Sequence, residues 1–335
     1  MGRHIAKAAI AAGNKLTFFN RGNTDDSLFP QQDHLRGDRD GKVDVLAGVN
    51  AEIVIDTSGY TPDAVRASAI AVAGTVRHYF FVSSVDAYDL SVPVIDESSP
   101  TRSLPDDATT SERIPELYGA HKVRCERDLM AILGPERVVV VRAGLMVGPY
   151  DATDRFTYWV ARVARGGEIL APRDRDMSVQ LIDVRDVADW IVNAMASNIN
   201  GVFNLVGNPG ALAMGDVLDA RQHQTQSNAR FTWVPDEFLL AHDVGPWVEM
   251  PLWLPDTADV RGLRNVRNDA ARASGLRLRS LKDTVRDTLA EYRSRPEGRL
   301  LRAGLSPQRE AALLEAWNKR DQSRAAHQYF ASRHT

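Results

Sequence analysis

The apolar and polar residues of this chain alternate between helical spacing and short, nearly continuous apolar runs. Within the first thirteen residues the apolar positions share one helix face: Ile5, Ala8, Ala9 and Ala12. Apolar runs bounded by small polar residues predict buried strands. We expect strands over 15–22, 34–39, 52–60, 79–84, 137–142 and 201–207, and helices over 1–13, 62–74, 116–133, 214–226, 280–293 and 306–320. Strands that alternate with helices indicate an α/β protein with a doubly wound parallel sheet.

Candidate chemistry lies at the junction of two of these elements. Tyr118 and Lys122 are four residues apart, and therefore share one face of the helix predicted over 116–133. An ammonium near a phenol stabilises the phenolate, so the phenol can exchange a proton near neutral pH. The preceding strand ends in Ser83 and Ser84, whose hydroxyls can bind the oxygen on which Tyr118 acts. Tyrosine and lysine at this spacing also occur in ordinary amphipathic helices, so the order of all these features is what makes the pattern informative.

This order resembles the extended short-chain dehydrogenase/reductase superfamily, which includes the NAD-dependent epimerases and dehydratases. The resemblance covers nearly the whole chain. In that superfamily a Ser or Thr, a Tyr and a Lys form the catalytic set, and the Ser usually precedes an aromatic residue by four positions. Ser84 and Tyr88 have this spacing. The resemblance therefore implies Ser84, Tyr118 and Lys122 as catalytic residues, with Lys122 also holding the nicotinamide ribose.

The resemblance also implies a Rossmann-like fold. We expect a dinucleotide-binding domain over residues 1–149 and a smaller substrate-binding lobe over 150–335, with 178–207 returning to the core sheet. In the resembled proteins a strand and a Gly-x-x-Gly-x-x-Gly turn precede the first helix, and the turn holds the pyrophosphate. Gly2 matches the last glycine of that turn, whereas the strand and the first two glycines are absent from the sequence as given.

Two explanations for this difference stay open. The start of the chain can be assigned too far downstream or the chain truncated, or the protein can be a variant that has given up the dinucleotide. Either way, we expect the sequence as given to bind a dinucleotide weakly or not at all. Adding an apolar strand and a glycine-rich turn ahead of Arg3 should then restore binding.

The other expected cofactor contacts follow three predicted strands. Asn20 and Arg21 end the first of them, where NAD-preferring relatives usually carry an acidic residue. An Arg there can pair with a 2′-phosphate, which slightly favours NADP over NAD, and an exposed turn arginine is an equally open interpretation. Asp38 matches a position that often contacts the adenine in the resembled proteins. Thr57 and Ser58 are among the small polar residues that end the strand over 52–60, in a loop that borders the nicotinamide ribose in those proteins.

The second half of the chain offers candidate substrate contacts. Arg155 and Tyr158 lie in a segment that places a cation among aromatic side chains, which can bind a ring or an anionic group. The same pattern also fits a helix that packs its aromatic face on a sheet. We expect the segment between Ser84 and Tyr118 to be a solvated loop that can cover a substrate, and Asp186 to cap or open a helix.

Composition narrows the class of protein. The 335 residues carry 41 Lys and Arg against 44 Asp and Glu, a net charge of −3, which gives no reason to expect nucleic acid or an anionic membrane as a partner. The single cysteine, Cys125, provides neither a disulfide framework nor a metal site. No apolar run approaches about 18 residues, and no signal peptide is evident, so we expect a cytoplasmic protein. A homodimer is expected by analogy alone.

The pattern and the resemblance together imply an NAD(P)-dependent oxidoreductase, of the ketone/alcohol reductase or epimerase type, acting on a small molecule with Tyr118 as general acid/base. The alternative is a non-redox protein on the same scaffold, either a cofactor-free lyase or cyclase, or a binding protein.

Overall fold

The chain forms two compact units. The computed structural model describes residues 1–23, 28–41 and 43–331, with side chains up to residue 320. The first unit contains Met1–Met146, Gln180–Pro209 and Ala258–Leu278, and the second contains Val147–Val179, Gly210–Thr257 and Arg279–Thr335. Segment 258–278 therefore lies in the first unit, although we expected it in the substrate lobe.

Parallel strands form the centre of the first unit. Four of them are hydrogen-bonded in the order β3 (Ile53–Asp56), β4 (His78–Ser84), β5 (Val138–Ala143) and β9 (Gly201–Leu205). A separate parallel pair is formed by β1 (Thr17–Asn20) and β2 (Asp33–Arg36). Short strands β6 (Leu145–Val147) and β8 (Leu181–Asp183) pair with each other. The strand pairs of the four-stranded sheet and the β1–β2 pair are all parallel, so the predicted α/β fold with parallel sheets is confirmed.

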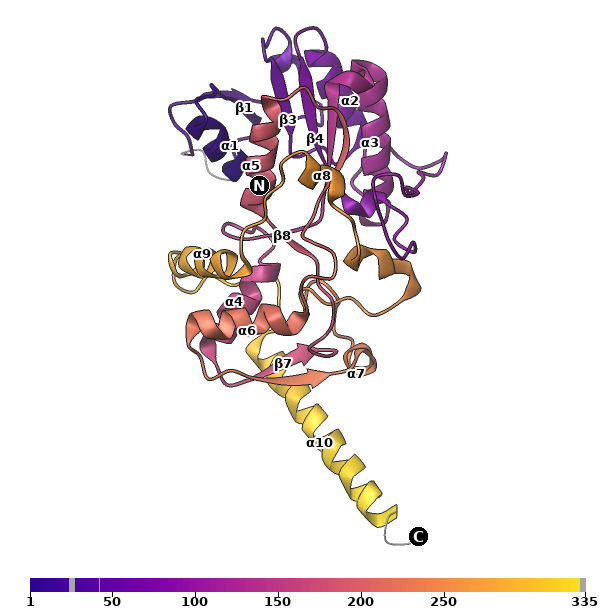
Figure 1. Ribbon diagram of the computed structural model, residues 1–335, viewed down its shortest axis with the longest axis vertical. Helices are drawn as coiled ribbons and strands as arrows, with labels where there is room; N and C mark the ends of the chain where they lie inside the picture. Colours follow the sequence, from indigo (N-terminus) through magenta and orange to yellow (C-terminus); the bar gives the residue numbers. More distant parts are fainter. Residues whose placement is uncertain (24–27, 42, 332–335) are drawn as a thin grey trace. The chain divides into compact units, whose positions relative to one another are not determined.

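Helices cover both faces of the four-stranded sheet, as Figure 1 shows. On one face lie α1 (Gly2–Ala11) and α5 (Val184–Met195), and on the other lie α2 (Pro62–Val72) and α3 (Tyr118–Leu133). The alternating residues of β4 divide between the two sides: Phe80 and Val82 pack in the core under α1 and α5, whereas Tyr79 and Phe81 pack in the core under α2 and α3. This is the doubly wound arrangement expected of a Rossmann-like fold.

Local chemistry explains where two of these helices end or begin. Helix α1 is followed by Gly13 at a φ of +81°, a left-handed conformation that glycine adopts without strain. Helix α5 is capped by Asp183, whose carboxylate accepts the N–H of Arg185 at 2.8 Å. Asp186, which we expected to cap or open this helix, lies in its first turn, so the capping residue is Asp183.

The segment between Ser84 and Tyr118 is more firmly packed than we expected. It contains the short helices η2 (Val85–Ala87) and η3 (Pro115–Leu117). Leu90 and Ile95 are buried together with Val266, and the N–H of Arg267 donates to the carbonyl of Ile95 at 2.7 Å. The first part of this segment is therefore attached to 258–278 and is not a simple solvated loop.

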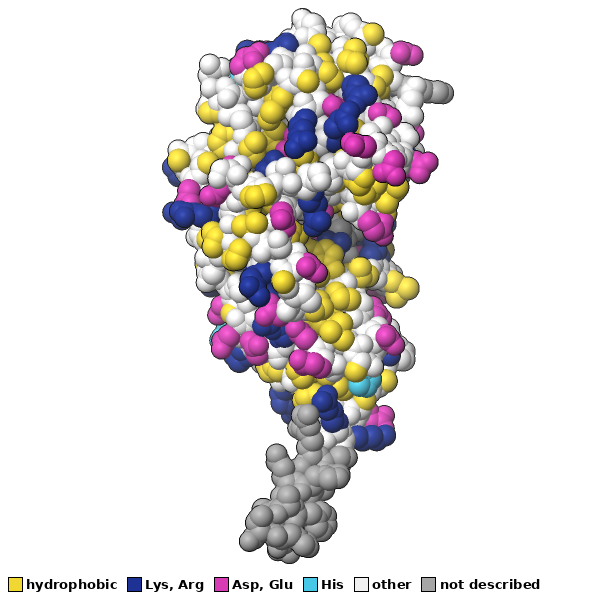
Figure 2. All heavy atoms as spheres, turned by 90° about the vertical axis from the view of Figure 1, so that its right-hand side faces the viewer, with side chains coloured by type: hydrophobic (Ala, Val, Ile, Leu, Met, Phe, Trp, Pro, Cys, Tyr) yellow, Lys and Arg dark blue, Asp and Glu magenta, His cyan; other side chains and the backbone are white. Residues whose placement is uncertain are grey.

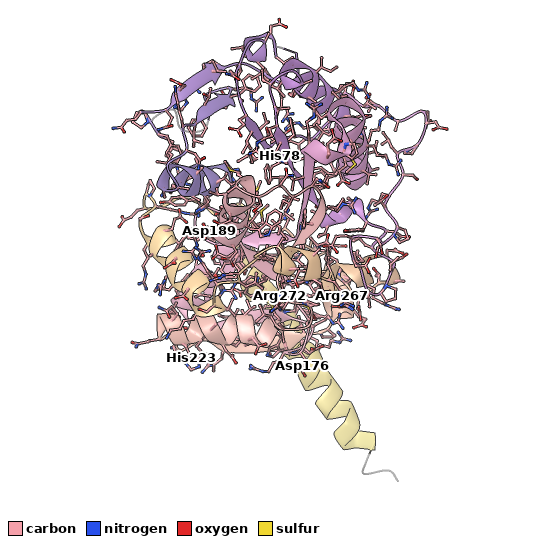
Figure 3. All side chains as sticks on the ribbon, turned by 45° about the horizontal axis from the view of Figure 1, so that its top comes forward. His78, Asp176, Asp189, His223, Arg267 and Arg272 are labelled. Carbon is pink, nitrogen blue, oxygen red and sulfur yellow. The ribbon has the colours of Figure 1, made fainter. Side chains whose placement is uncertain are left out.

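Segment 258–278 contains η5 (Ala258–Arg264) and α8 (Asp269–Ala273). Two of its arginines, Arg267 and Arg272, are labelled in Figure 3. The carbonyl of Arg267 accepts the side-chain amide of Asn204 at 3.1 Å, and Arg272 donates to Asn208 at 3.2 Å. These contacts hold the segment against β9 and the residues that follow it.

The second unit combines a two-stranded parallel sheet with helices. The sheet consists of β7 (Glu168–Pro172) and β10 (Arg230–Val234). The helices are α4 (Arg155–Arg165), α6 (Met214–Thr225), α7 (Asp236–Ala241), α9 (Leu281–Arg293) and α10 (Pro307–Ala331). The predicted start of α10 is confirmed, because Ser306 accepts the N–H of Arg309 at 3.2 Å and Pro307 is the first helical residue. The remaining short helices of the described chain are η1 (Asp44–Leu46) and η4 (Pro135–Arg137).

Side chains of both charges are interspersed on the face shown in Figure 2. Within the described residues, no helix combines the length and the apolar character needed to cross a membrane.

Candidate active site

The two serines at the end of β4 have different surroundings. Ser83 is 4% exposed, and its hydroxyl donates to Glu126 of α3 at 2.5 Å. Glu126 is also paired with Arg142 of β5, so the Ser83 hydroxyl belongs to a buried polar network. Ser84 is partly exposed, and its oxygen accepts the N–H of Asp86 at 3.1 Å. Of the two hydroxyls, that of Ser84 is better placed to meet a substrate.

Lys122 joins the helix α3 to the ends of two strands. Its side chain is buried, and Nζ donates to the carbonyls of Gly59 at 2.7 Å and Val82 at 2.9 Å. The same nitrogen lies 5.6 Å from the centre of the Tyr118 ring. Burial lowers the pKa of Lys122 to about 8, and the charge of Asp56 partly opposes this shift. The geometry thus brings the predicted lysine and tyrosine together.

A second tyrosine, which the sequence analysis did not assign to the site, lies in the same place. The Tyr60 ring is 6.5 Å from the Tyr118 ring and 5.2 Å from the Lys122 nitrogen. The Arg113 guanidinium covers the Tyr60 ring at 4.6 Å. Tyr60 is 39% exposed, so its ring is accessible from solvent beside Tyr118.

The start of α3 approaches the turn after β4 very closely. A Cβ atom at Gly119 would lie 2.0 Å from the backbone carbonyl of Asp86, a distance that no side chain tolerates. Arg102 holds the same turn, because its guanidinium donates to the carbonyl of Asp86 at 2.8 Å and to the carboxylate at 3.1 Å. Burial raises the pKa of Asp86, against the effect of Arg102. Glycine directly after Tyr118 is thus what allows this tyrosine to lie next to the turn that follows Ser84.

Three of the expected cofactor residues meet at the ends of β1 and β2. The Arg21 guanidinium lies 3.7 Å from the Asp38 carboxylate, with the two side chains 56% and 45% exposed. The carbonyl of Asn20 accepts the N–H of Gly37 at 3.3 Å, and its side-chain oxygen accepts from Arg36. An ion pair this exposed contributes little to stability. Breaking this ion pair so that Arg21 or Asp38 can bind a ligand therefore costs little free energy.

The remaining expected cofactor residues lie at the end of β3. Thr57 is adjacent to the amino end of α1, since a Cβ atom at Gly2 would lie 3.7 Å from the Thr57 hydroxyl oxygen. Ser58 is exposed, and its hydroxyl accepts from Arg39 at 3.2 Å. A helix amino end beside the carboxyl ends of parallel strands suits a phosphate. The residues present at these strand ends are chemically suited to a dinucleotide.

A buried ion pair at the same strand end was not anticipated from the sequence. Arg39 contacts both carboxylate oxygens of Asp56, at 2.6 and 2.8 Å. Asp56 also accepts the hydroxyl of Tyr79 and the N–H of Ser58, each at 3.0 Å. Burial by itself raises the pKa of Asp56, but the charge and hydrogen bonds of Arg39 outweigh it, so the pKa is lowered. Asp56 is thus a buried carboxylate with four donors.

The two expected substrate contacts belong to the second unit. The guanidinium of Arg155 lies 5.0 Å from the ring centre of Trp247. Tyr158 is 3% exposed, and a Cβ atom at Gly304 would lie only 1.8 Å from its ring. Tyr158 is therefore a packing residue of the second unit, where it lies against Gly304. We do not propose it as a substrate contact.

The fold matches solved structures of epimerases. The UDP-glucose 4-epimerase of Thermus thermophilus, in complex with NAD, has a TM-score of 0.64 and 17% identity over 88% of this chain and 96% of that chain. Bordetella bronchiseptica WbmH, in complex with NAD+, has a TM-score of 0.65 and 16% identity over 88% and 94%. The UDP-glucose 4-epimerase of Thermotoga maritima, with UDP-glucose, has a TM-score of 0.65 and 16% identity over 87% and 95%. Identities this low show the common fold. No curated protein matches the sequence.

The sequence also matches a family model. The model of the NAD dependent epimerase/dehydratase family matches residues 1–205, which is more than half of the chain and includes Ser84, Tyr118 and Lys122. Membership supports the binding of NAD(H). The chain belongs to the NAD-dependent epimerase/dehydratase family and is an NAD-dependent enzyme of the extended short-chain dehydrogenase/reductase type.

Proposed function

We propose that this protein oxidises and reduces a carbinol or carbonyl carbon of a small molecule, either as a ketone/alcohol reductase or as an epimerase. Tyr118 is the general acid/base, Lys122 stabilises its phenolate, and Ser84 orients the substrate oxygen. The observation that carries the proposal is the position of Lys122. Its buried ammonium is fixed by the carbonyls of Gly59 and Val82, with the Tyr118 ring 5.6 Å away.

These residues divide the work of proton transfer. NAD(H), when bound, supplies the hydride chemistry. The Tyr118 oxygen takes the proton of a substrate hydroxyl, or returns it to a carbonyl oxygen. The Lys122 charge favours the phenolate, and a pKa of about 8 keeps this charge largely present at neutral pH. Because the Ser84 oxygen already accepts from Asp86, its own proton can be donated to the substrate oxygen.

The contribution of Ser84 is tested by Ser84→Ala. Loss of a hydrogen bond to an oxygen that gains charge costs about 1.5–3 kcal/mol, so we expect turnover to fall roughly 10- to 100-fold. The assay follows the absorbance of the nicotinamide with a panel of small alcohols and ketones. With UDP-glucose it follows the epimerised product, because an epimerase returns the hydride and leaves no net change in the nicotinamide. Ser91→Ala is the matched control, since that hydroxyl donates to the exposed Asp89 in the same part of the chain.

Two outcomes of this assay would contradict the proposal. Equal turnover by the parent protein and Ser84→Ala would remove Ser84 from the site. The non-redox alternative would be favoured if a substrate were converted without NAD(H), and if the nicotinamide absorbance changed neither transiently nor at steady state.

Cofactor choice is tested at Arg21. We propose that Arg21 leaves Asp38 to pair with a 2′-phosphate, so that NADP(H) binds more tightly than NAD(H). A charge-assisted contact of this kind contributes about 1.5–3 kcal/mol, and Arg21→Ala should erase the difference. Calorimetric titration with both cofactors measures it. Lys15→Ala is the control, because Lys15 forms an even more exposed ion pair with Asp33 at the opposite ends of β1 and β2. Equal affinities in the parent protein would leave Arg21 without this role.

A further inference from the structure

The guanidinium of Arg39 connects several segments of the first unit. Besides the two bonds to Asp56, it donates to the hydroxyls of Ser58 at 3.2 Å and Ser68 at 3.3 Å. Arg39 lies in the loop after β2, directly after Asp38. The Arg39 side chain is 13% exposed and that of Asp56 is 4% exposed. A buried carboxylate and guanidinium with this bidentate geometry fix their segments strongly, because separating them leaves a charge unpaired.

The residues that follow β3 are thereby held from two sides. Arg39 fixes Asp56 and Ser58, and the N–H of Ser58 also donates to Asp56. One residue further on, the carbonyl of Gly59 accepts from Lys122. Gly59 is itself closely packed, since a Cβ atom there would lie 2.5 Å from the Phe81 ring. Arg39 and Lys122 thus hold the same short loop, 56–59, at its two ends.

We propose that Arg39 is a positioning residue which, through Asp56, fixes loop 56–59 and so sets the place of the Lys122 ammonium. The inference deepens the proposed function, on which it rests for the role of Lys122. It also gives a reason why an arginine follows directly after Asp38. The same loop that carries Asp38 to the cofactor side is attached through Arg39 to the residues that hold the catalytic lysine.

The charges around Lys122 predict how this connection can be measured. Asp56 raises the pKa of Lys122 and Arg39 lowers it, while Glu126 and the neutral thiol of Cys125, both on α3, face it as well. The rings of Tyr60, Phe81 and Tyr118 surround the nitrogen at 4.9–5.6 Å. Among these groups, Asp56 and Arg39 form an ion pair whose members can be removed one at a time.

The experiment titrates Lys122 by NMR in the protein without cofactor. The chain contains six lysines, so selectively labelled lysine gives few resonances, and Lys122→Arg identifies the one that belongs to Lys122. Asp56→Asn removes a negative charge, so the pKa should fall below about 8. Arg39→Gln removes a positive charge, so the pKa should rise toward its ordinary value. In the double variant Arg39→Gln/Asp56→Asn, the pKa of Lys122 should return close to about 8. The double variant leaves no buried charge unpaired, so it can be titrated even if a single variant does not fold.

Arg77→Gln is the matched control, because Arg77 pairs with Glu52 at 2.7 Å near the opposite end of β3. It should leave the pKa of Lys122 unchanged. The same order of the variants is expected for the pH at which turnover declines on the alkaline side. A Lys122 pKa that is unmoved in all the variants, or a double variant no closer to the parent than the singles, would overturn the proposal. Since the titration needs neither substrate nor cofactor, its result is separate from that of the Tyr118 and Ser84 variants.

Discussion

Tyr118→Phe is expected to lower kcat by roughly 100- to 10,000-fold, the usual contribution of a positioned general acid/base. The substitution removes only the phenolic oxygen and keeps the ring beside Tyr60 and Lys122. Since Tyr118 is the first residue of α3 and is partly exposed, loss of one oxygen should leave the free energy of unfolding nearly unchanged. The fall should therefore appear in kcat, with the circular dichroism and thermal midpoint close to those of the parent.

Tyr60→Phe is the discriminating comparison for this experiment. Both tyrosines lie near the Lys122 nitrogen, and the Tyr60 ring is slightly closer, at 5.2 Å against 5.6 Å. Tyr60 is exposed and lies in the loop after β3, whereas Tyr118 lies beside the turn after Ser84. A large loss in Tyr60→Phe with little loss in Tyr118→Phe would move the acid/base role to Tyr60. Tyr292→Phe, in the second unit, serves as the control for removing a tyrosine hydroxyl elsewhere.

The pattern of apolar residues predicted the strands and helices of the first unit well, because burial of apolar side chains produces both the pattern and the packing. Strands buried on both faces read as apolar runs, so β4 and β5 are evident from the sequence. The places of Ser84 at a strand end and Lys122 on a helix were predictable because both are local features, while their catalytic roles stay predictions. The glycine directly after Tyr118 is a further sequence signal, because the close approach of Gly119 to the Asp86 backbone leaves no room for a side chain.

Contacts between distant segments were beyond the reach of such patterns. Arg39 and Asp56 are seventeen positions apart, and no periodicity indicates that a loop arginine will fold onto a strand end. Tyr158 has the surroundings expected of either a ligand contact or a packing residue, and the choice is made by Gly304, far along the chain. The acidic residues and prolines between Ser84 and Tyr118 suggested a solvated loop. The packing of this segment against 258–278 was missed because the two segments are far apart in the sequence.

A buried arginine in the second unit is another residue that patterns do not reveal. Arg221 of α6 is fully buried, and its guanidinium lies 4.1 Å from the Phe156 ring centre. One nitrogen donates to the carbonyl of Val217 at 2.6 Å, but Nε and Nη2 have no hydrogen-bond partner among the described residues. Burial lowers the pKa of Arg221, although a guanidinium still keeps its proton at neutral pH. The fold therefore contains a buried cation without a carboxylate partner among the residues that the structure describes.

Arg221→Met is expected to stabilise the second unit by about 1–4 kcal/mol, because an apolar side chain of similar length replaces a buried charge at little cost in packing. Five of the six tryptophans lie in this unit, so denaturation followed by tryptophan fluorescence reports on it. Arg162→Met is the matched control of opposite sign. Arg162 is also buried, but it is paired with Glu310 at 2.6 Å, and its loss should destabilise the unit by about 3–5 kcal/mol. If Arg221→Met destabilises the unit as Arg162→Met does, then the Arg221 charge is stabilised by its surroundings in solution. Its burial would then not lower the stability of the unit.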